Sequence, residues 1–415
     1  MSGKLPLLVI GGGIAGMTAA IEAAEAGAEV VLVESLPYLG GRVVRNHLYF
    51  PKLCPPLCGL EINLQRLTRN ERIRVFTSTR IVGAERTGSK WAVELETAPQ
   101  WINEKCTACG ECAKVCTTEV SDPFNLEMNK VKAVRLPHPA AWPHRYVLDS
   151  DACTPDELQA IAEACPVGAV DLDASASRHT IEAGAIIVAT GWQPYSPSRL
   201  DNLGAGNIAD VITNVQMERM AAEDGPTGGR IQRISDARQP RKVAFVQCAG
   251  SRDVNHLPYC SGVCCLASLK QALYVKEQIP DCQVDIFYID RRALGRNEDV
   301  LRRVEGLEGV RLIKGKAGKI QSDGNEIVLR LEDVESGRML EARADLVVLA
   351  TGMVPNLASE KLPIPVAVDE DGFAVDDPQQ AIFAAGVARR PEEVAATTRD
   401  ATGAAAKAMA AMRRA

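Results

Sequence analysis

The sequence predicts an α/β protein with two nucleotide-binding folds, the first of which is interrupted by a small cysteine-rich domain. A short apolar run, Leu5–Ile10, leads into the glycine-rich turn Gly11–Gly16 and a helical stretch, the pattern of a strand, a tight turn and a helix. Two later apolar runs end in the same Ala-Thr-Gly triplet, at Ala189–Gly191 and Ala350–Gly352, and indicate two folds of similar plan. Residues 100–175 break this pattern and hold six cysteines.

The expected elements alternate between strands and helices, as in doubly wound folds. In chain order they are a strand at Leu5–Ile10, a helix at Ala15–Ala26, a strand at Glu29–Glu34, a meander over 72–98, a strand at Ala185–Gly191, a strand at Lys242–Gln247, a helix at Leu266–Gln278, a strand at Gln283–Asp290, strands near 310–314, 326–332 and 345–350, and a C-terminal strand, loop and alanine-rich helix. We therefore assign residues 1–99, 176–240 and 353–415 to the first fold, 241–352 to the second fold, and 100–175 to the insertion.

Composition excludes several classes of protein. The net charge of −6 and the aromatic fraction of 4% argue against a nucleic-acid partner. No apolar run reaches the length of about 18 residues that a membrane span needs, and no segment has the form of a secretory signal. Thirteen cysteines without an export signal favour metal or redox chemistry over a disulfide scaffold. We expect a cytoplasmic protein that meets a membrane only through partner subunits.

The glycine turn predicts a dinucleotide site. Gly11 permits the tight turn, Gly13 lets the backbone approach a pyrophosphate, and Gly16 allows close packing of helix against strand. The N-terminal end of the helix then faces the negative charge of the phosphates. Glu34 ends the second strand at the distance expected for a carboxylate that accepts hydrogen bonds from ribose hydroxyls.

Further motifs favour FAD over NAD at this site. Gly40-Gly41-Arg42 and Ala189-Thr190-Gly191 resemble elements of flavoproteins with two dinucleotide-binding folds, the plan of thioredoxin reductase. Phe383–Gly386 resembles the C-terminal flavin motif of that class, although Val387 stands where an acidic residue is usual. The residues expected to bind FAD are Gly11, Gly13, Ile14, Ala15, Gly16, Glu34, Gly41, Arg42, Thr190, Gly191 and Gly386.

The second fold lacks the sequence of a nicotinamide site. The turn that follows its first strand reads Cys248-Ala249-Gly250-Ser251-Arg252, with one glycine where the dinucleotide motif has three. We therefore expect no NAD(P)H site there.

The insertion carries the cysteine spacing of a bacterial ferredoxin. Cys106, Cys109 and Cys112 are followed by Cys116, with Thr117 in place of the usual proline. In two-cluster ferredoxins the fourth cysteine of each run ligates the other cluster. Cys165-Pro166 has the form of the end of a second run, and Cys153 of its beginning, but the middle cysteines are absent. We expect one [4Fe–4S] cluster on Cys106, Cys109, Cys112 and Cys165, with Cys116 and Cys153 left as free thiols or a labile disulfide. The rival set is Cys106, Cys109, Cys112 and Cys116.

Spacing alone assigns no single role to the other cysteines or to the histidines. Cys248, Cys260, Cys264 and Cys265 form a group that matches no common zinc pattern and can also be read as buried apolar side chains. Cys54 and Cys58 are either a redox pair or structural, and Cys282 is expected in the core. Among the five histidines, His138 and His144 are expected at the surface. No catalytic triad or carboxylate pair stands out, and no catalytic side chain is assigned.

Together, these motifs resemble a known family. The glycine turn, the cysteine pair after Phe50-Pro51, the ferredoxin run, VQCAGSRD at 246–253 and YCSGVCC at 259–265 resemble the A subunit of heterodisulfide reductase over essentially the whole chain. The resemblance implies a second [4Fe–4S] cluster near the FAD, held by Cys248, Cys260, Cys264 and Cys265.

Within this family the length and the stretch KLCPPLCGLEIN are most similar to the A subunit of the quinone-interacting membrane-bound oxidoreductases of sulfate reducers. This resemblance implies an electron-transfer oxidoreductase subunit. Its partners would be two further subunits, one with flavin and iron–sulfur centres and one in the membrane with haem and iron–sulfur centres, which link menaquinone to adenylylsulfate reductase. The alternatives are the A subunit of a sulfur-oxidising heterodisulfide reductase-like complex and a stand-alone NAD(P)H-dependent disulfide reductase.

Overall fold

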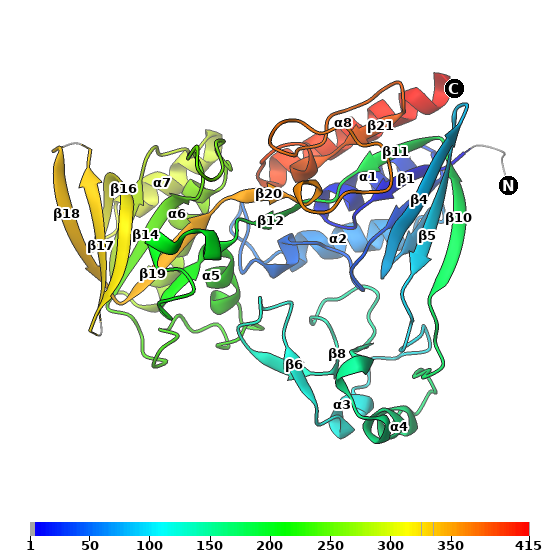
Figure 1. The fold of residues 1–415 in the computed structure, drawn as a ribbon, viewed down its shortest axis with the longest axis horizontal. Coiled ribbons are helices and arrows are strands. Elements are labelled where there is room, and N and C mark those ends of the chain that lie inside the picture. The colour runs from blue at the N-terminus through cyan, green and yellow to red at the C-terminus, as the bar shows by residue number, and fades with distance from the viewer. Residues whose placement is uncertain (1–4, 325, 335, 415) are drawn as a thin grey trace.

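The computed structural model describes residues 5–324, 326–334 and 336–414. Two α/β folds lie side by side, and the inserted domain lies below them in the view of Figure 1. The short antiparallel pair of β12 (Trp192–Pro194) and β20 (Met353–Pro355) crosses from one fold to the other. The two ends of the described chain, near residues 5 and 414, lie at the outer end of the first fold.

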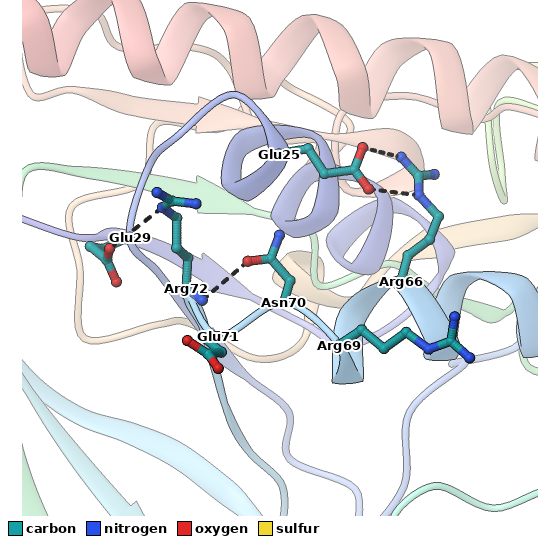
Figure 2. A pocket seen from close by; sticks show the side chains of 7 residues that line it. All are labelled: Glu25, Glu29, Arg66, Arg69, Asn70, Glu71 and Arg72. Atoms are coloured by element: carbon teal, nitrogen blue, oxygen red, sulfur yellow. Dashed lines mark hydrogen bonds and ion pairs between the residues drawn. The ribbon is translucent and has the colours of Figure 1, made fainter.

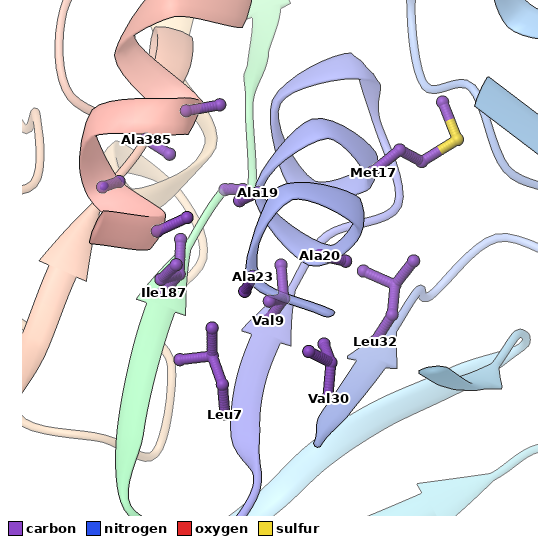
Figure 3. Close-up of a cluster of buried hydrophobic side chains, with 14 of the residues drawn as sticks. Leu7, Val9, Met17, Ala19, Ala20, Ala23, Val30, Leu32, Ile187 and Ala385 are labelled. Carbon is purple, nitrogen blue, oxygen red and sulfur yellow. The ribbon is translucent and has the colours of Figure 1, made fainter. Parts of the chain in front are cut away.

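The first fold is built on a five-stranded parallel sheet whose strands come from distant parts of the chain. Its helix α1 packs on β1 and β2 through Ala19, Ala20 and Ala23, which are fully buried and keep the helix close to the sheet (Figure 3). The sheet order is β21 (Ile382–Ala384), β11 (Ala185–Val188), β1 (Leu7–Ile10), β2 (Val30–Val33) and β3 (Ile73–Phe76), and the helices are α1 (Ile14–Glu25), α2 (Leu57–Thr68) and α8 (Val394–Arg414). The strand, helix and strand expected around the glycine turn are confirmed.

An antiparallel layer covers the other face of this sheet. Its order is β10 (Ser177–Ala183), β5 (Lys90–Thr97) and β4 (Thr79–Thr87). Trp91, Val93 and Leu95 of β5 are buried against the parallel sheet because alternate residues of a strand share one face. The meander expected over 72–98 is correct for β4 and β5, whereas β3 is a parallel strand of the main sheet.

The second fold is built on a seven-stranded sheet. It runs β13 (Val211–Thr213), β19 (Leu346–Thr351), β14 (Lys242–Ala249), β15 (Gln283–Tyr288), β16 (Val310–Asp323), β17 (Glu326–Asp333) and β18 (Arg338–Ala344), with α5 (Asn214–Ala221), α6 (Cys264–Gln278) and α7 (Glu298–Glu305). The structure differs from the expected boundary at 240, because β13 pairs with β19 and α5 packs on α6. The polar strand β18, whose alternation is weak, was not expected from the sequence.

The insertion is a small domain with its own core between β5 and β10. It contains β6 (Glu119–Ser121), β7 (Lys130–Lys132), β8 (Val134–Arg135), β9 (Val147–Leu148), α3 (Glu111–Val115) and α4 (Pro155–Glu163). Cys112, Cys116 and Ile161 are buried in that core. Across the described residues, no helix combines the length and the apolar character needed to cross a membrane.

A buried arginine joins the insertion to both folds. The guanidinium of Arg219, on α5, is 1% exposed and donates to Asn125 Oδ1 at 2.7 Å and to Asp224 at 2.8 Å. It also lies 4.6 Å from the ring centroid of Phe124, in the insertion, and donates to the carbonyl oxygen of Arg45 in the first fold. One side chain therefore holds three parts of the chain in register.

The expectation that His138 lies at the surface is wrong. Its ring stacks on Phe124 with centroids 4.8 Å apart, and the residue is only 6% exposed. Burial lowers the pKa of His138 to about 4, so the ring is neutral at physiological pH. His144 is exposed, as expected.

Candidate functional site

The turn between β1 and α1 has the shape that its glycines predict. Gly11 has φ +104°, and a Cβ there would lie 2.4 Å from the carbonyl oxygen of Ala189 on the neighbouring strand β11. A Cβ on Gly16 would lie 1.7 Å from the carbonyl oxygen of Gly11. Gly13 is the N-cap of α1, so unpaired backbone N–H groups of the first helical turn face outward from the sheet.

A cavity of about 640 Å³ opens at this helix end and runs between the two folds. Most of the residues expected to bind FAD line it, namely Gly11, Gly13, Ile14, Ala15, Glu34, Gly41, Arg42, Thr190 and Gly191. Gly16 and Gly386 are not in its wall. Gly16 packs against the backbone of the glycine turn at Gly11. A Cβ on Gly386 would lie 2.8 Å from the Ala15 side chain. Gly386 therefore supports α1, and its neighbour Val387 lines the cavity instead.

Glu34 is held as a buried carboxylate beside the glycine turn. Its Oε2 accepts a hydrogen bond from Gly12 N at 2.6 Å, and its Oε1 accepts from Leu36 N at 2.8 Å. Burial raises the pKa of Glu34, and the backbone donors oppose this shift. The carboxylate is oriented for a ligand with hydroxyl donors.

Unpaired polar atoms show that the cavity suits a polar ligand. Within the described part of the chain, Thr190 Oγ1, Arg45 Nε and Glu392 Oε2 are buried without a hydrogen-bond partner, and all three residues line the cavity. Unpaired buried polar atoms are costly, by about 1–3 kcal/mol each. FAD, which has hydroxyl groups and a ring with donors and acceptors, can form hydrogen bonds with such unpaired atoms in the cavity wall.

The sequence did not reveal a buried ion pair in the cavity wall. Lys270 Nζ on α6 lies 3.1 Å from Glu218 Oε1 on α5, and both residues are about 5% exposed. Glu218 also accepts from Gln271 Nε2 at 2.6 Å. The sequence contained one indication of Lys270 as a site residue, because it follows Cys265 by little more than one turn of the same helix. The pair places an ammonium group, balanced by a carboxylate, at the side of the cavity formed by the second fold.

The second cysteine group gathers at the beginning of α6. Cys264 and Cys265 open this helix. Cys248 is the second-last residue of β14 and has a left-handed conformation with φ +55°, and Cys260 lies on the connecting loop. A hydrogen bond from Cys264 and the nearby Arg252 and Arg292 lower the pKa of Cys248. Burial raises the pKa of Cys265, and the nearby Cys248 and Cys260 raise it further. Cys264 and Cys265 therefore lie at the positive end of a helix dipole, and Cys248 and Cys260 lie near enough to Cys265 to affect its pKa.

The loop that joins β14 to α6 differs from a phosphate-binding turn. Residues 250–263 separate β14 from α6, whereas a dinucleotide motif joins strand and helix directly. The loop closes on itself, with Ser251 Oγ 2.9 Å from Ser261 Oγ, and Ser261 Oγ accepts from Met353 N. A Cβ on Gly352 would lie 2.4 Å from Ser251 Oγ, so the loop also packs against the end of β19.

The first cysteine group lies in the insertion, where Cys106, Cys109 and Cys165 are near enough to Cys112 to affect its pKa. Burial raises the pKa of Cys112 to about 11, and the thiols of Cys106, Cys165 and Cys109 contribute to this shift. Cys116 lies beside Cys153 instead. Ala169 N donates to Cys165 Sγ at 3.2 Å, and Ala108 N points to Cys106 Sγ at 3.4 Å, which are the backbone contacts that iron–sulfur sites use.

Cys54 and Cys58 flank the beginning of α2 near the cavity. Tyr49, which lines the cavity, has its pKa raised first by burial and then by Cys54 and Cys58. Cys58 is exposed and Cys54 is half-buried. The structure brings the pair to the cavity rim without assigning it a role. Cys282 is buried in the core of the second fold, as expected.

A shallow hollow of about 720 Å³ on the outer surface is a different kind of feature (Figure 2). It is lined by charged residues that neutralise one another. Arg66 binds Glu25 at 2.6 Å, and Arg72 lies 3.8 Å from Glu29. No cofactor is assigned to it.

Known proteins with this fold and these motifs define its class. The thioredoxin reductases of Lactococcus lactis and T. acidophilum both align with a TM-score of 0.53, at 14% and 13% identity, and the alignments cover at least 98% of each chain. The family described as FAD dependent oxidoreductase matches residues 6–52, and the 4Fe-4S binding domain matches residues 99–120. The chain is a flavoprotein oxidoreductase with two dinucleotide-binding folds and a ferredoxin-type insertion, as the sequence predicted.

The curated relatives are A subunits of heterodisulfide reductases. The A subunit of the H(2):CoB-CoM heterodisulfide,ferredoxin reductase of Methanothermobacter thermautotrophicus is 35% identical over 97% of this chain and 63% of that protein. The second iron-sulfur A subunit of the CoB--CoM heterodisulfide reductase of Methanopyrus kandleri is 34% identical over 98% of this chain and 64% of that protein. The chain is therefore similar to heterodisulfide reductase A subunits over nearly its whole length.

The relatives are longer than this chain. The chain spans 63% and 64% of the two proteins above. It spans 52% of the A subunit of the ferredoxin/F(420)H(2)-dependent CoB-CoM heterodisulfide reductase of Methanosarcina acetivorans, to which it is 36% identical. A substantial part of each relative therefore lies outside the alignment.

Proposed function

We propose that this chain is an electron-transfer subunit in which one FAD and two [4Fe–4S] clusters form a relay. FAD supplies the exchange between two-electron and one-electron transfer. The observation that carries the proposal is the position of α6. This helix begins with Cys264 and Cys265, and its next residues, Leu266, Ala267 and Lys270, line the cavity.

Specific residues are proposed to bind each cofactor of this relay. The proposed FAD ligands are the cavity-lining residues given above, with Gly16 and Gly386 supporting α1. The proposed cluster ligands are Cys106, Cys109, Cys112 and Cys165 in the insertion and Cys248, Cys260, Cys264 and Cys265 in the second fold. Lys270, whose charge Glu218 balances and whose ammonium group Glu218 orients, would donate a hydrogen bond toward the flavin ring.

The insertion reaches the same cavity from the other side. Leu126, which follows the Phe124 and Asn125 contacts with Arg219, lines the cavity wall. The Arg219 junction thus holds the insertion in a constant position relative to the flavin cavity. Electron exchange between a cluster and a flavin proceeds at a steady rate only when the distance between them stays constant.

We further propose that the relay joins menaquinone to adenylylsulfate reductase, in a complex attached to the inner membrane by a haem-bearing subunit. This finer proposal depends on the stretch KLCPPLCGLEIN at 52–63, which contains the approach to α2 and the first part of that helix. A second redox subunit of flavin and iron–sulfur type completes the complex. The A subunit of a sulfur-oxidising complex is the competing identity.

Capture of partners tests the finer proposal. We expect native purification from membranes, with this chain as bait, to recover an iron–sulfur flavoprotein together with a membrane subunit that bears haem. Recovery of lipoate-type sulfur carriers would favour the sulfur-oxidising complex. Recovery of the chain alone, active on a small disulfide, would contradict both identities.

Nicotinamide nucleotides are expected to be poor reductants of this chain. Because residues 250–263 replace the phosphate turn with a closed loop, anaerobic mixing with NADH or NADPH should leave the flavin absorbance unchanged over the time of a catalytic turnover. Dithionite, which needs no binding site, should bleach the flavin fully in the same cell. Rapid bleaching by NADH or NADPH would revive the disulfide reductase alternative.

A further inference from the structure

A second metal-binding arrangement lies in the insertion, apart from the cysteines assigned to the cluster. Cys116 Sγ, Cys153 Sγ and a carboxylate oxygen of Glu157 all lie within 4.8 Å of one another. Cys116 is 1% exposed, and the other two residues are half-buried. The three come from two segments, since Cys116 ends α3 whereas Cys153 and Glu157 flank the first turn of α4.

The carboxylate is fixed in place for a ligand role. Glu157 Oε1 accepts hydrogen bonds from the backbone N–H groups of Thr117 and Thr118, at 2.5 and 2.9 Å, and Oε2 accepts from Thr118 Oγ1 at 2.6 Å. These donors directly follow Cys116 in the chain and hold the carboxylate beside its thiol. Carboxylates that ligate metals are commonly held by such outer hydrogen bonds, which set their orientation.

The spacing suits a single ion better than a cluster. With Zn–S near 2.3 Å and Zn–O near 2.1 Å, the ligand atoms of a tetrahedral ion lie about 3.5–3.8 Å apart. The three ligand atoms, which lie within 4.8 Å of one another, would move slightly closer together on binding the ion. A cubane needs four ligands, each on a separate iron, and so holds its thiolates farther apart. Cys116, Cys153 and Glu157 supply three close ligands, and water can complete a tetrahedron.

We propose that Cys116, Cys153 and Glu157 bind one thiophilic divalent metal ion, of the Zn²⁺ type, which ties the end of α3 to the beginning of α4. Binding displaces one proton from each thiol, so one M²⁺ replaces two H⁺ with no change in oxidation state. The ion also offsets the repulsion between two thiolates and a carboxylate. This inference goes beyond the proposed relay, and it depends on the assignment of Cys165, and not Cys116, to the cluster.

Zinc retention in the full-length chain tests the proposal. The chain and its variants are purified without oxygen, equilibrated with one equivalent of Zn²⁺ and passed over a weak chelator, and zinc, iron and FAD are then measured per chain. We expect the wild type to retain one zinc ion. Cys153→Ser is expected to weaken zinc binding at least about 100-fold, and Glu157→Gln about 10-fold or more. Cys58→Ser, which removes an exposed thiol elsewhere, should retain zinc as the wild type does.

Three results would overturn the proposal. The first is equal zinc retention by the wild type and Cys153→Ser, and the second is a loss of about four irons in Cys153→Ser, which would make Cys153 a cluster ligand. The third is a Cys116–Cys153 disulfide, found by mass spectrometry in the oxygen-free wild type. Iron and FAD contents report on the relay separately, since a chain with full iron and FAD but no zinc contradicts this inference alone.

Discussion

A Gly16→Ala variant is expected to fold with little or no bound FAD. The new Cβ would lie 1.7 Å from the carbonyl oxygen of Gly11, a backbone atom that has no freedom to rotate away. To relieve this overlap, the turn must move away from α1, which displaces the backbone donors at Gly13 from the pyrophosphate. Overpacking of this kind costs about 1–3 kcal/mol, so we expect FAD affinity to fall by roughly 10–100-fold. Flavin absorbance per chain after gel filtration measures the loss.

Gly403→Ala is the matched control for this substitution. Gly403 lies within α8, and a Cβ there would meet no heavy atom within 4 Å. Replacing a helical glycine by alanine stabilises a helix by about 1 kcal/mol, so this variant should retain FAD and melt slightly higher. A Gly16→Ala protein with full flavin content would show that the turn does not hold the cofactor.

Loss of one cysteine from either group is expected to remove about half of the iron. Two cubanes give about eight irons per chain in protein purified without oxygen. Cys109→Ala and Cys260→Ala should each lower this value to about four, because a cubane with three protein ligands is labile. FAD content should stay near one per chain in Cys109→Ala, whose position in the insertion is outside the cavity wall. Iron analysis and the visible spectrum of each variant measure the outcome.

The choice of the fourth ligand in the insertion can be tested in the same series. Cys165 raises the pKa of Cys112, whereas Cys116 lies beside Cys153. We therefore expect Cys165→Ala to lose about four irons and Cys116→Ala to keep about eight. The reverse result would establish the local set of Cys106, Cys109, Cys112 and Cys116. Cys282→Ala, which removes a buried thiol from the core of the second fold, is the control and should keep all iron.

Short-range patterns in the sequence were sufficient for the fold class and for the dinucleotide turn. The alternation of strand, glycine turn and helix over residues 5–34 depends on neighbours in the chain, and the structure has these elements within one or two residues of the expected ends. The degenerate turn at Cys248 was visible for the same reason, since a phosphate loop needs its glycines at fixed, closely spaced positions. Cysteine spacing was likewise informative, because a cluster takes ligands from one loop.

Side chains that meet from distant segments were decided by tertiary structure alone. Lys270 and Glu218 form their ion pair across two helices, and Arg219 joins α5 to the insertion and to the first fold. The sequence marked His138 as a surface residue because prolines surround it, whereas the contact with Phe124 buries it. These features arise from the packing of separate units, which local periodicity does not describe.

The insertion shows both kinds of information within one small domain. By itself the sequence determined that Cys106, Cys109 and Cys112 lie together, since their spacing allows one loop to present three thiols to one cluster. The sequence also predicted Cys165 as the fourth ligand and left Cys116 and Cys153 over. Only the tertiary structure decided that Cys116 meets both Cys153 and Glu157. The physical reason is that α4 must pack against α3 before either contact exists, and that packing depends on the buried side chains between the helices and not on any spacing along the chain.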